Sequence, residues 1–117
     1  MAYTKKAQTF HRTSGQRRSL MKSLSRSLIL EERISTTEAK AKALRPVVER
    51  LVTYAKKNTL ASRRLAKSRL GDDEAVAKLF ATLGPRYADR KGGYTRIVKR
   101  AARGANDARK LAYIAFV

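Results

Sequence analysis

The sequence predicts an α+β fold in two layers, in which helices cover one face of a small three-stranded mixed sheet. The first observation is a four-residue spacing of Leu, Ala and Val in several segments, which is the period of one helix face. The second is a set of three short runs rich in β-branched and aromatic residues, at residues 33–36, 92–100 and 111–117. Together these segments give the element order α-β-α-α-α-β-β. The length of 117 residues fits a single globular domain over residues 14–117, preceded by a basic arm over residues 1–13.

The arm over residues 1–13 contains Lys5, Lys6 and Arg12, no acidic residue and little that could pack in a core. Such a segment is a disordered terminus in the free protein or an arm that orders when it meets RNA, and both descriptions can hold. We therefore place it outside the globular domain.

The first predicted helix runs from about Gly15 to Leu30, with Ser14 as its N-cap. Leucines spaced by four residues line one face, and cations with the same spacing lie roughly opposite. The leucines are Leu20, Leu24 and Leu28, and the cations are Arg18, Lys22 and Arg26. No acidic residue precedes Glu31, so these cations have no local ion-pair partner. A basic stripe of this kind suits a membrane surface or RNA, and the lack of aromatic anchors on the apolar side favours RNA.

A short strand is predicted at residues 33–36, and a second helix follows it and runs to about Lys57. Thr36 or Thr37 is the expected N-cap of this helix. Pro46 interrupts the helical pattern, so it either kinks this helix or begins another one.

A third helix is predicted over residues 60–70, where Thr59 supplies a cap and Gly71 ends the helix. The helix carries four cations, namely Arg63, Arg64, Lys67 and Arg69. A run of charges usually marks a solvated face. Without acidic partners, and in so basic a chain, this run favours a contact face for an anion.

The fourth helix is predicted to begin at Asp72-Asp73-Glu74 and to end sharply at Gly84-Pro85. Capping and the helix dipole explain the three carboxylates at its start. A metal site is the alternative, but consecutive carboxylates at a helix start converge poorly on one ion. We therefore expect no metal site here.

A basic loop over residues 86–91 leads into the predicted strand at residues 92–100, which begins with two glycines. Both faces of this strand carry cations, so it is an edge strand with solvated arginines or a strand whose cations meet phosphates. Residues 101–110 are expected to form a polar hairpin loop. The last run, residues 111–117, is apolar on both faces, which predicts a buried, central strand.

The net charge bounds the class of partner. With 28 Lys and Arg against 9 Asp and Glu, the chain carries a charge of +19 and has a pI of about 11.2. A compact domain with that charge repels itself, so a polyanion is the expected partner, with nucleic acid first and an anionic membrane second. The longest apolar run is far too short to span a bilayer, and the N-terminus lacks the apolar core of a secretory signal. The sequence therefore predicts a soluble, intracellular protein. Because the first helix lacks aromatic anchors, nucleic acid is preferred to a membrane surface, and no membrane partner is expected.

The residues that enzymes need are scarce. The chain has no cysteine, and its single histidine, His11, lies in the arm. A nuclease would need carboxylates placed around a metal or water, or a histidine with a partner. We therefore predict no catalysis, no metal, no cofactor and no small-molecule substrate.

Several short motifs, in a specific order and spacing, give the chain a family resemblance. The strongest are Lys78-Leu79-Phe80 with Leu83-Gly84-Pro85-Arg86-Tyr87, and Gly92-Gly93-Tyr94-Thr95-Arg96-Ile97. Further matches are Arg12-Thr13-Ser14 with Arg17 and Arg18, Ile34-Ser35-Thr36-Thr37 with Lys40-Ala41-Lys42, and the Tyr113 to Val117 end. From about Phe10 to Val117 the sequence resembles the bacterial ribosomal protein L17 family of the large subunit.

The resemblance implies a scaffold role in the cytoplasmic ribosome. Proteins of that family bind large-subunit ribosomal RNA, lie near the peptide tunnel exit beside other large-subunit proteins, and help the subunit assemble. The resemblance implies a two-layer α/β fold, no catalysis and no homo-oligomer. A general DNA-binding, nucleoid-type protein is the alternative, because composition alone does not separate DNA from RNA.

The residues expected to contact RNA are the cations of the arm, helices, loops and strand, with a few polar and aromatic neighbours. They are Lys5, Lys6, His11, Arg12, Thr13, Ser14, Arg17, Arg18, Lys22, Arg26, Arg63, Arg64, Lys67, Arg86, Tyr87, Arg90, Lys91, Tyr94, Arg96, Arg100, Arg103 and Arg109. Two of them, Tyr87 and Tyr94, either stack on bases or pack in the core.

Overall fold

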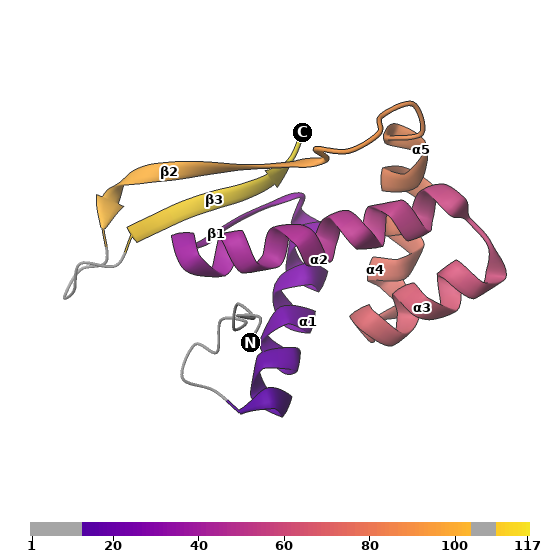
Figure 1. Cartoon of the computed structure of the whole chain (residues 1–117), viewed down its shortest axis with the longest axis horizontal. Coiled ribbons are helices and arrows are strands. Elements are labelled where there is room, and N and C mark those ends of the chain that lie inside the picture. Colours follow the sequence, from indigo (N-terminus) through magenta and orange to yellow (C-terminus); the bar gives the residue numbers. More distant parts are fainter. Residues whose placement is uncertain (1–12, 104–109) are drawn as a thin grey trace, which may run out of the picture.

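A computed structural model of the chain describes residues 13–103 and 110–117 (Figure 1). The elements in order are α1 (Ser14–Glu31), β1 (Arg33–Thr37), α2 (Glu38–Lys57), α3 (Leu60–Leu70), α4 (Asp73–Lys78), the π-helix η1 (Leu79–Leu83), α5 (Gly84–Arg86), β2 (Thr95–Arg103) and β3 (Lys110–Phe116). Because α4, η1 and α5 follow one another without a break, the predicted order of helices and strands is confirmed.

The sheet has the strand order β1-β3-β2, so the last strand is central, as its apolar composition predicted. The expected mixed sheet is wrong in one respect, because β3 pairs antiparallel with both β1 and β2. β2 and β3 form a hairpin, which makes that pair antiparallel, and β1 adds to the free side of β3. The register aligns Ile34, Ile114 and Ile97 in one row across the three strands.

Helices cover one face of the sheet, and no element in the described part of the chain covers the other (Figure 1). On the covered face, Ala112 and Ile114 of β3 are fully buried against Leu44 and Val48 of α2 and Leu28 of α1. A second apolar cluster joins the far half of α2 to α3, α4 and η1 through residues that include Leu51, Leu70, Leu79, Leu83 and the two tyrosines Tyr87 and Tyr94. This arrangement confirms the predicted two layers.

Side-chain caps fix where the helices begin. Thr13, not Ser14, caps α1, because the Thr13 hydroxyl accepts the Gln16 N–H at 3.3 Å while the Gln16 side chain accepts the Thr13 N–H at 3.1 Å. Of the two expected caps of α2, Thr37 is the one found. The predicted cap at Thr59 and the predicted helix end at Gly71 are confirmed.

Pro46 lies inside α2, and the helix runs through it without a second start, so the second of the two alternatives, a new helix at Pro46, is wrong. The proline is on the exposed side of α2, whereas Leu44 and Val48 next to it are fully buried. Their burial holds the helix together although proline cannot donate the usual backbone hydrogen bond.

The predicted sharp stop at Gly84-Pro85 is also wrong, because the helix continues to Arg86. The Gly84 N–H bonds to the Leu79 carbonyl, five residues back, and this wider π turn leaves room for the ring of Pro85. Gly84 packs directly on α2, where a Cβ atom would lie 2.9 Å from the carbonyl oxygen of Ala55. The glycine therefore permits a close approach of two helices instead of ending one.

The strand predicted at residues 92–100 begins later and ends later, as β2 over Thr95–Arg103. Gly93 has a left-handed φ of 64°, which turns the chain before the strand, and Tyr94 packs into the core. Residues 101–103 of the predicted hairpin loop thus belong to β2, and its last residue, Lys110, begins β3. The rest of that loop, residues 104–109, and residues 1–12 of the arm lie outside the described residues.

Candidate nucleic-acid interface

Only a minority of the described Lys and Arg side chains form an ion pair with a carboxylate of the described residues. In the described part of the chain, Glu32, Glu38, Glu49 and Asp73 form all the ion pairs. Their partners are Lys42, Arg45, Lys67, Lys78, Arg86 and Lys99. Since the chain has 28 Lys and Arg, most described cations have no ion pair within this part of the molecule.

Helix α1 presents the first group of these cations. Arg18, Lys22 and Arg26 are exposed and one helical turn apart, and Arg17 beside them is half-buried. The opposite side of α1 buries Leu28 and Ile29, which fixes the direction in which the cations point. The Lys22 ammonium also lies close to Gly71, where α3 ends and backbone carbonyls carry partial negative charge.

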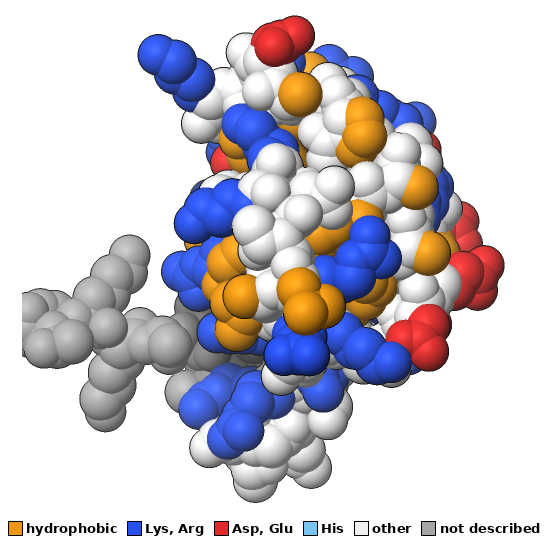
Figure 2. All heavy atoms as spheres, turned by 90° about the vertical axis from the view of Figure 1, so that its right-hand side faces the viewer, with side chains coloured by type: hydrophobic (Ala, Val, Ile, Leu, Met, Phe, Trp, Pro, Cys, Tyr) orange, Lys and Arg blue, Asp and Glu red, His pale blue; other side chains and the backbone are white. Residues whose placement is uncertain are grey.

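Helix α3 carries the second group of cations, and two of the four contact other side chains of the protein. Arg63 stacks over the Phe80 ring at 4.6 Å from the ring centroid, and Lys67 pairs with Asp73 at 2.6 Å. Arg64 and Arg69 are exposed and have no ion pair among the described residues. Figure 2 shows that Lys and Arg side chains dominate the left and lower parts of this end of the molecule, and that acidic side chains lie at its right edge and at its top.

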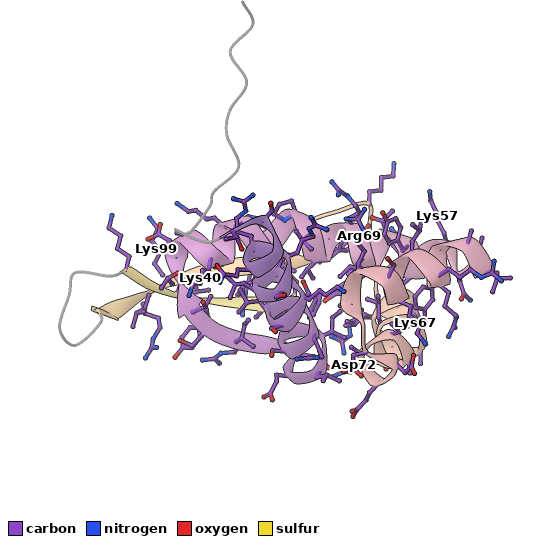
Figure 3. All side chains as sticks on the ribbon, turned by 90° about the horizontal axis from the view of Figure 1, so that it is seen from below. Lys40, Lys57, Lys67, Arg69, Asp72 and Lys99 are labelled. Carbon is purple, nitrogen blue, oxygen red and sulfur yellow. The ribbon has the colours of Figure 1, made fainter. Side chains whose placement is uncertain are left out.

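Cations also extend along the whole of α2. In Figure 3, Lys40 of α2 and Lys99 of β2 lie toward the sheet end of the molecule, and Lys57 of α2 and Lys67 of α3 lie toward the other end. Asp72 lies near the end of α3, where it caps α4 by accepting the Glu74 N–H at 3.1 Å. The cap and the pair between Asp73 and Lys67 confirm a structural role for these two carboxylates.

The two tyrosines expected at the interface are core residues. Tyr87 and Tyr94 are each only 3% exposed, and their ring centroids are 5.2 Å apart. The Tyr87 hydroxyl donates to the Val117 carbonyl at 2.6 Å, while the Tyr94 hydroxyl accepts from the Lys56 ammonium at 2.8 Å and donates to the Arg90 carbonyl at 3.1 Å. Of the two alternatives, the structure has the core packing, and neither ring is open to a base.

Arg86 belongs to an internal ion-pair group. Its guanidinium donates to the Glu32 carboxylate, and the Lys78 ammonium lies 3.2 Å from the same carboxylate. The hydrogen bond from Arg86 lowers the pKa of Glu32, and the same contact raises the pKa of Arg86. Arg86 therefore ties η1 and α5 to the turn after α1. Arg90 donates to the Gly92 carbonyl at 3.2 Å, and Lys91 is exposed.

The open face of the sheet carries Arg96 and Arg100, and it also carries two residues that the sequence reasoning did not select. Arg33 of β1 and Tyr113 of β3 lie together there, with the Arg33 Cζ 4.0 Å from the Tyr113 ring centroid. The alternation of residue types in residues 33–36 could have placed Arg33 on the outer face of the sheet. The structure agrees, because Arg33 and Ser35 are exposed whereas Ile34 and Thr36 are half-buried. Only the strand pairing shows which aromatic residue Arg33 meets.

The remaining residues predicted to contact RNA lie at the ends of elements or outside the described residues. Thr13 and Ser14 are exposed at the start of α1, and Arg103 ends β2. Lys5, Lys6, His11 and Arg12 in the arm, and Arg109 in the hairpin loop, lie outside the described residues.

Within residues 13–103 and 110–117, no three or more His, Cys, Asp or Glu side chains are grouped so that they could hold a metal ion. No helix in that part of the chain is both long and apolar enough to cross a membrane.

Comparison with known proteins gives a consistent result. A family model described as "Ribosomal protein L17" matches residues 20–117. The chain is 57% identical to the "Large ribosomal subunit protein bL17" of a Hydrogenobaculum species over 117 residues, which is 100% of this chain and 99% of that protein. It is also 57% identical to the protein of the same name from Sphingopyxis alaskensis over 106 residues, which is 91% of this chain and 76% of that protein.

Proposed function

The chain belongs to the ribosomal protein L17 family, and we propose on this basis that it binds and stabilises large-subunit ribosomal RNA. The family is a structural component of the large ribosomal subunit, so the protein has a structural role in the ribosome and is not an enzyme. The observation that carries the RNA proposal is the row of exposed cations on α1, which have no ion pair among the described residues.

The mechanism is phosphate neutralisation. RNA segments that converge in a folded subunit repel one another through their phosphates, and cations placed between them offset that repulsion. The planar guanidinium of an arginine can donate to two phosphates at once, which suits a junction. Arg18 and Arg26 on α1 and Arg64 and Arg69 on α3 are exposed arginines of this kind.

The position in the subunit is part of the same proposal. We place the protein near the peptide tunnel exit beside other large-subunit proteins, where it supports assembly of the subunit and so translation in the cytoplasm. The resemblance of its motifs to the family supports this placement. Recognition of RNA shape should outweigh recognition of base sequence, because paired RNA exposes little sequence information to side chains.

The test compares RNA with duplex DNA. We would measure binding of the full chain to refolded large-subunit ribosomal RNA and to duplex DNA over a series of salt concentrations. Preference for the RNA is expected at moderate salt, with an affinity loss of about 10³- to 10⁵-fold between roughly 50 and 200 mM salt. Equal or tighter binding to the DNA would move the general DNA-binding alternative to first place.

A matched pair of variants tests the α1 face. Arg18→Gln with Arg26→Gln removes two cations without an ion pair, and Lys42→Gln with Arg45→Gln removes two exposed cations that pair within α2. The change in net charge is the same in both. Only the α1 variant should reduce the slope of log affinity against log salt, by about 0.7 to 0.9 for each phosphate that is no longer neutralised. Equal reductions would mean that overall charge, and not this face, governs binding.

A further inference from the structure

The uncovered face of the sheet has arginines around a row that contains Tyr113 and Val98. Residues that alternate with the helix-facing ones form it, and the register places Ser35, Tyr113 and Val98 in its middle row. Val98 is 47% exposed, although it is apolar and central on this face. In the next row Ala115 of the central strand pairs with Arg33 on one side and with Arg96 on the other, so arginines border the row that holds Tyr113 and Val98.

Tyr113 lies between two of these arginines. The Arg33 Cζ is 4.0 Å and the Arg100 Cζ 5.1 Å from the centroid of its ring. Arg33 pairs with Ala115, which follows Tyr113 along β3. Arg100 comes directly after Lys99, and Lys99 pairs with Ala112, which precedes Tyr113. The two arginines therefore approach Tyr113 from opposite directions along β3. Arg100 also reaches across β3 and donates to the Ser35 hydroxyl at 2.8 Å. The three planar groups are therefore held together by contacts from all three strands.

No carboxylate neutralises this face in the described part of the chain. Arg33, Arg96 and Arg100 have no ion pair among these residues. Lys99 of β2, by contrast, is on the face that the helices cover and pairs with Glu38 of α2. Each of the two guanidinium groups turns one side of its plane to the Tyr113 ring, which leaves the outer side for a base and the N–H donors at its edge for an anion. The face thus combines planar stacking groups with phosphate donors.

We propose that this face of the sheet binds an unpaired RNA nucleotide, with its base on the Arg33–Tyr113–Arg100 stack and its phosphate on the guanidinium N–H groups. This rests on the proposed function, and it adds a second kind of RNA contact. A row of cations such as that on α1 suits the phosphates of any RNA backbone, but a planar, partly apolar group suits a base whose face is free. Paired bases in a helix do not offer such a face.

The test uses two fluorescent RNA hairpins of the same duplex, one blunt and one with a short single-stranded adenosine tail. The full chain should bind the tailed hairpin more tightly. Tyr113→Ala should lose that preference, with a loss on the tailed RNA of about 5- to 150-fold, while the slope of log affinity against log salt stays unchanged. Tyr113→Phe keeps the ring and should keep the preference.

A second variant keeps the test independent of folding. Arg33 is exposed, so Arg33→Lys should leave the fold intact, retain the charge and lose the planar stacking group. It should lower the preference for the tailed hairpin and leave binding to the blunt hairpin unchanged. Failure of the wild-type chain to bind either hairpin or ribosomal RNA would overturn the proposed function. Binding without preference for the tail, or a preference that survives in folded Tyr113→Ala and Arg33→Lys, would overturn only this inference.

Discussion

The hydroxyl of Tyr87 donates a hydrogen bond to the backbone carbonyl of Val117, at 2.6 Å, and thereby joins the end of the α4–η1–α5 run to the end of the sheet. The Tyr87 ring packs against Tyr94 and Phe116, at centroid distances of 5.2 and 6.4 Å. The Val117 N–H in turn donates to the Tyr94 carbonyl at 3.0 Å. Because Phe116 packs against both apolar clusters, this contact makes Tyr87 a connection between them.

The core role of Tyr87 can be tested by two substitutions. Tyr87→Ala should lower the free energy of unfolding by about 3–5 kcal/mol, because it leaves a cavity between buried rings. Tyr87→Phe should cost only about 0.5–1.5 kcal/mol, the contribution of the hydrogen bond, and should leave RNA affinity unchanged. Urea unfolding measures the first effect and filter binding the second. A folded Tyr87→Phe protein with strongly reduced RNA affinity would argue against a purely structural role.

Gly84 provides a prediction about packing. Gly84→Ala should destabilise the protein by about 1–3 kcal/mol, since the new Cβ would lie 2.9 Å from a backbone oxygen of α2, which cannot move as a side chain can. Gly15→Ala in α1 is the matched control, because nothing lies within 4 Å of its Cβ position, and it should stabilise by about 0.5–1 kcal/mol. Chemical denaturation of both variants compares the two values, and a neutral Gly84→Ala would contradict the close approach of α5 and α2.

Glu32 should make stability depend on pH. The pKa of its carboxyl is lowered in the folded protein, first by the hydrogen bond from Arg86, so the charged form favours folding. The contribution is present above the pKa that Glu32 has in the unfolded chain, and it is lost as the pH falls through the lower pKa of the folded state. Because the carboxylate is about one-third exposed, Glu32→Gln should cost only about 0.5–1 kcal/mol at pH 7. Urea unfolding across pH should show the difference from wild type shrink in acid, and a constant difference would contradict the ion-pair explanation.

Ser25 lies buried in α1, and its hydroxyl has no hydrogen-bond partner among the described residues. Ser25→Ala removes an unsatisfied polar atom and places a better helix former in the same space. The variant should therefore be more stable than wild type by about 0.5–2 kcal/mol in thermal or urea unfolding. A decrease in stability would show that the hydroxyl has a partner, such as a buried water.

Local signals predicted most helix starts well. Thr37, Thr59 and Asp72 are caps that act within their own first turn, so the sequence near each of them is sufficient to place the helix start. The error at Ser14 has the same scale, because neighbouring Thr13 and Ser14 are both good caps and only Thr13 has Gln16 three residues on.

The predictions that failed, or that missed a residue, depend on contacts between segments far apart in the chain. A Gly84-Pro85 pair is typical of a helix stop, and only the approach of Ala55 reveals why a glycine is needed within a continuing helix. Arg33 and Tyr113 are far apart in the chain, and the pairing of β1 with β3 alone brings them together. Tyr87 and Tyr94, flanked by arginines, matched the pattern of base-stacking residues, yet the tertiary structure buries both.

The most direct measurement is sedimentation of a cell lysate on a sucrose gradient, with the protein followed by immunoblot before and after salt washes. We predict that the protein sediments with the large ribosomal subunit and leaves it only at high salt, because many interactions with phosphates must break together. Finding the protein mainly free, or with the nucleoid, at low salt would contradict a role as a stable, RNA-bound component of the ribosome.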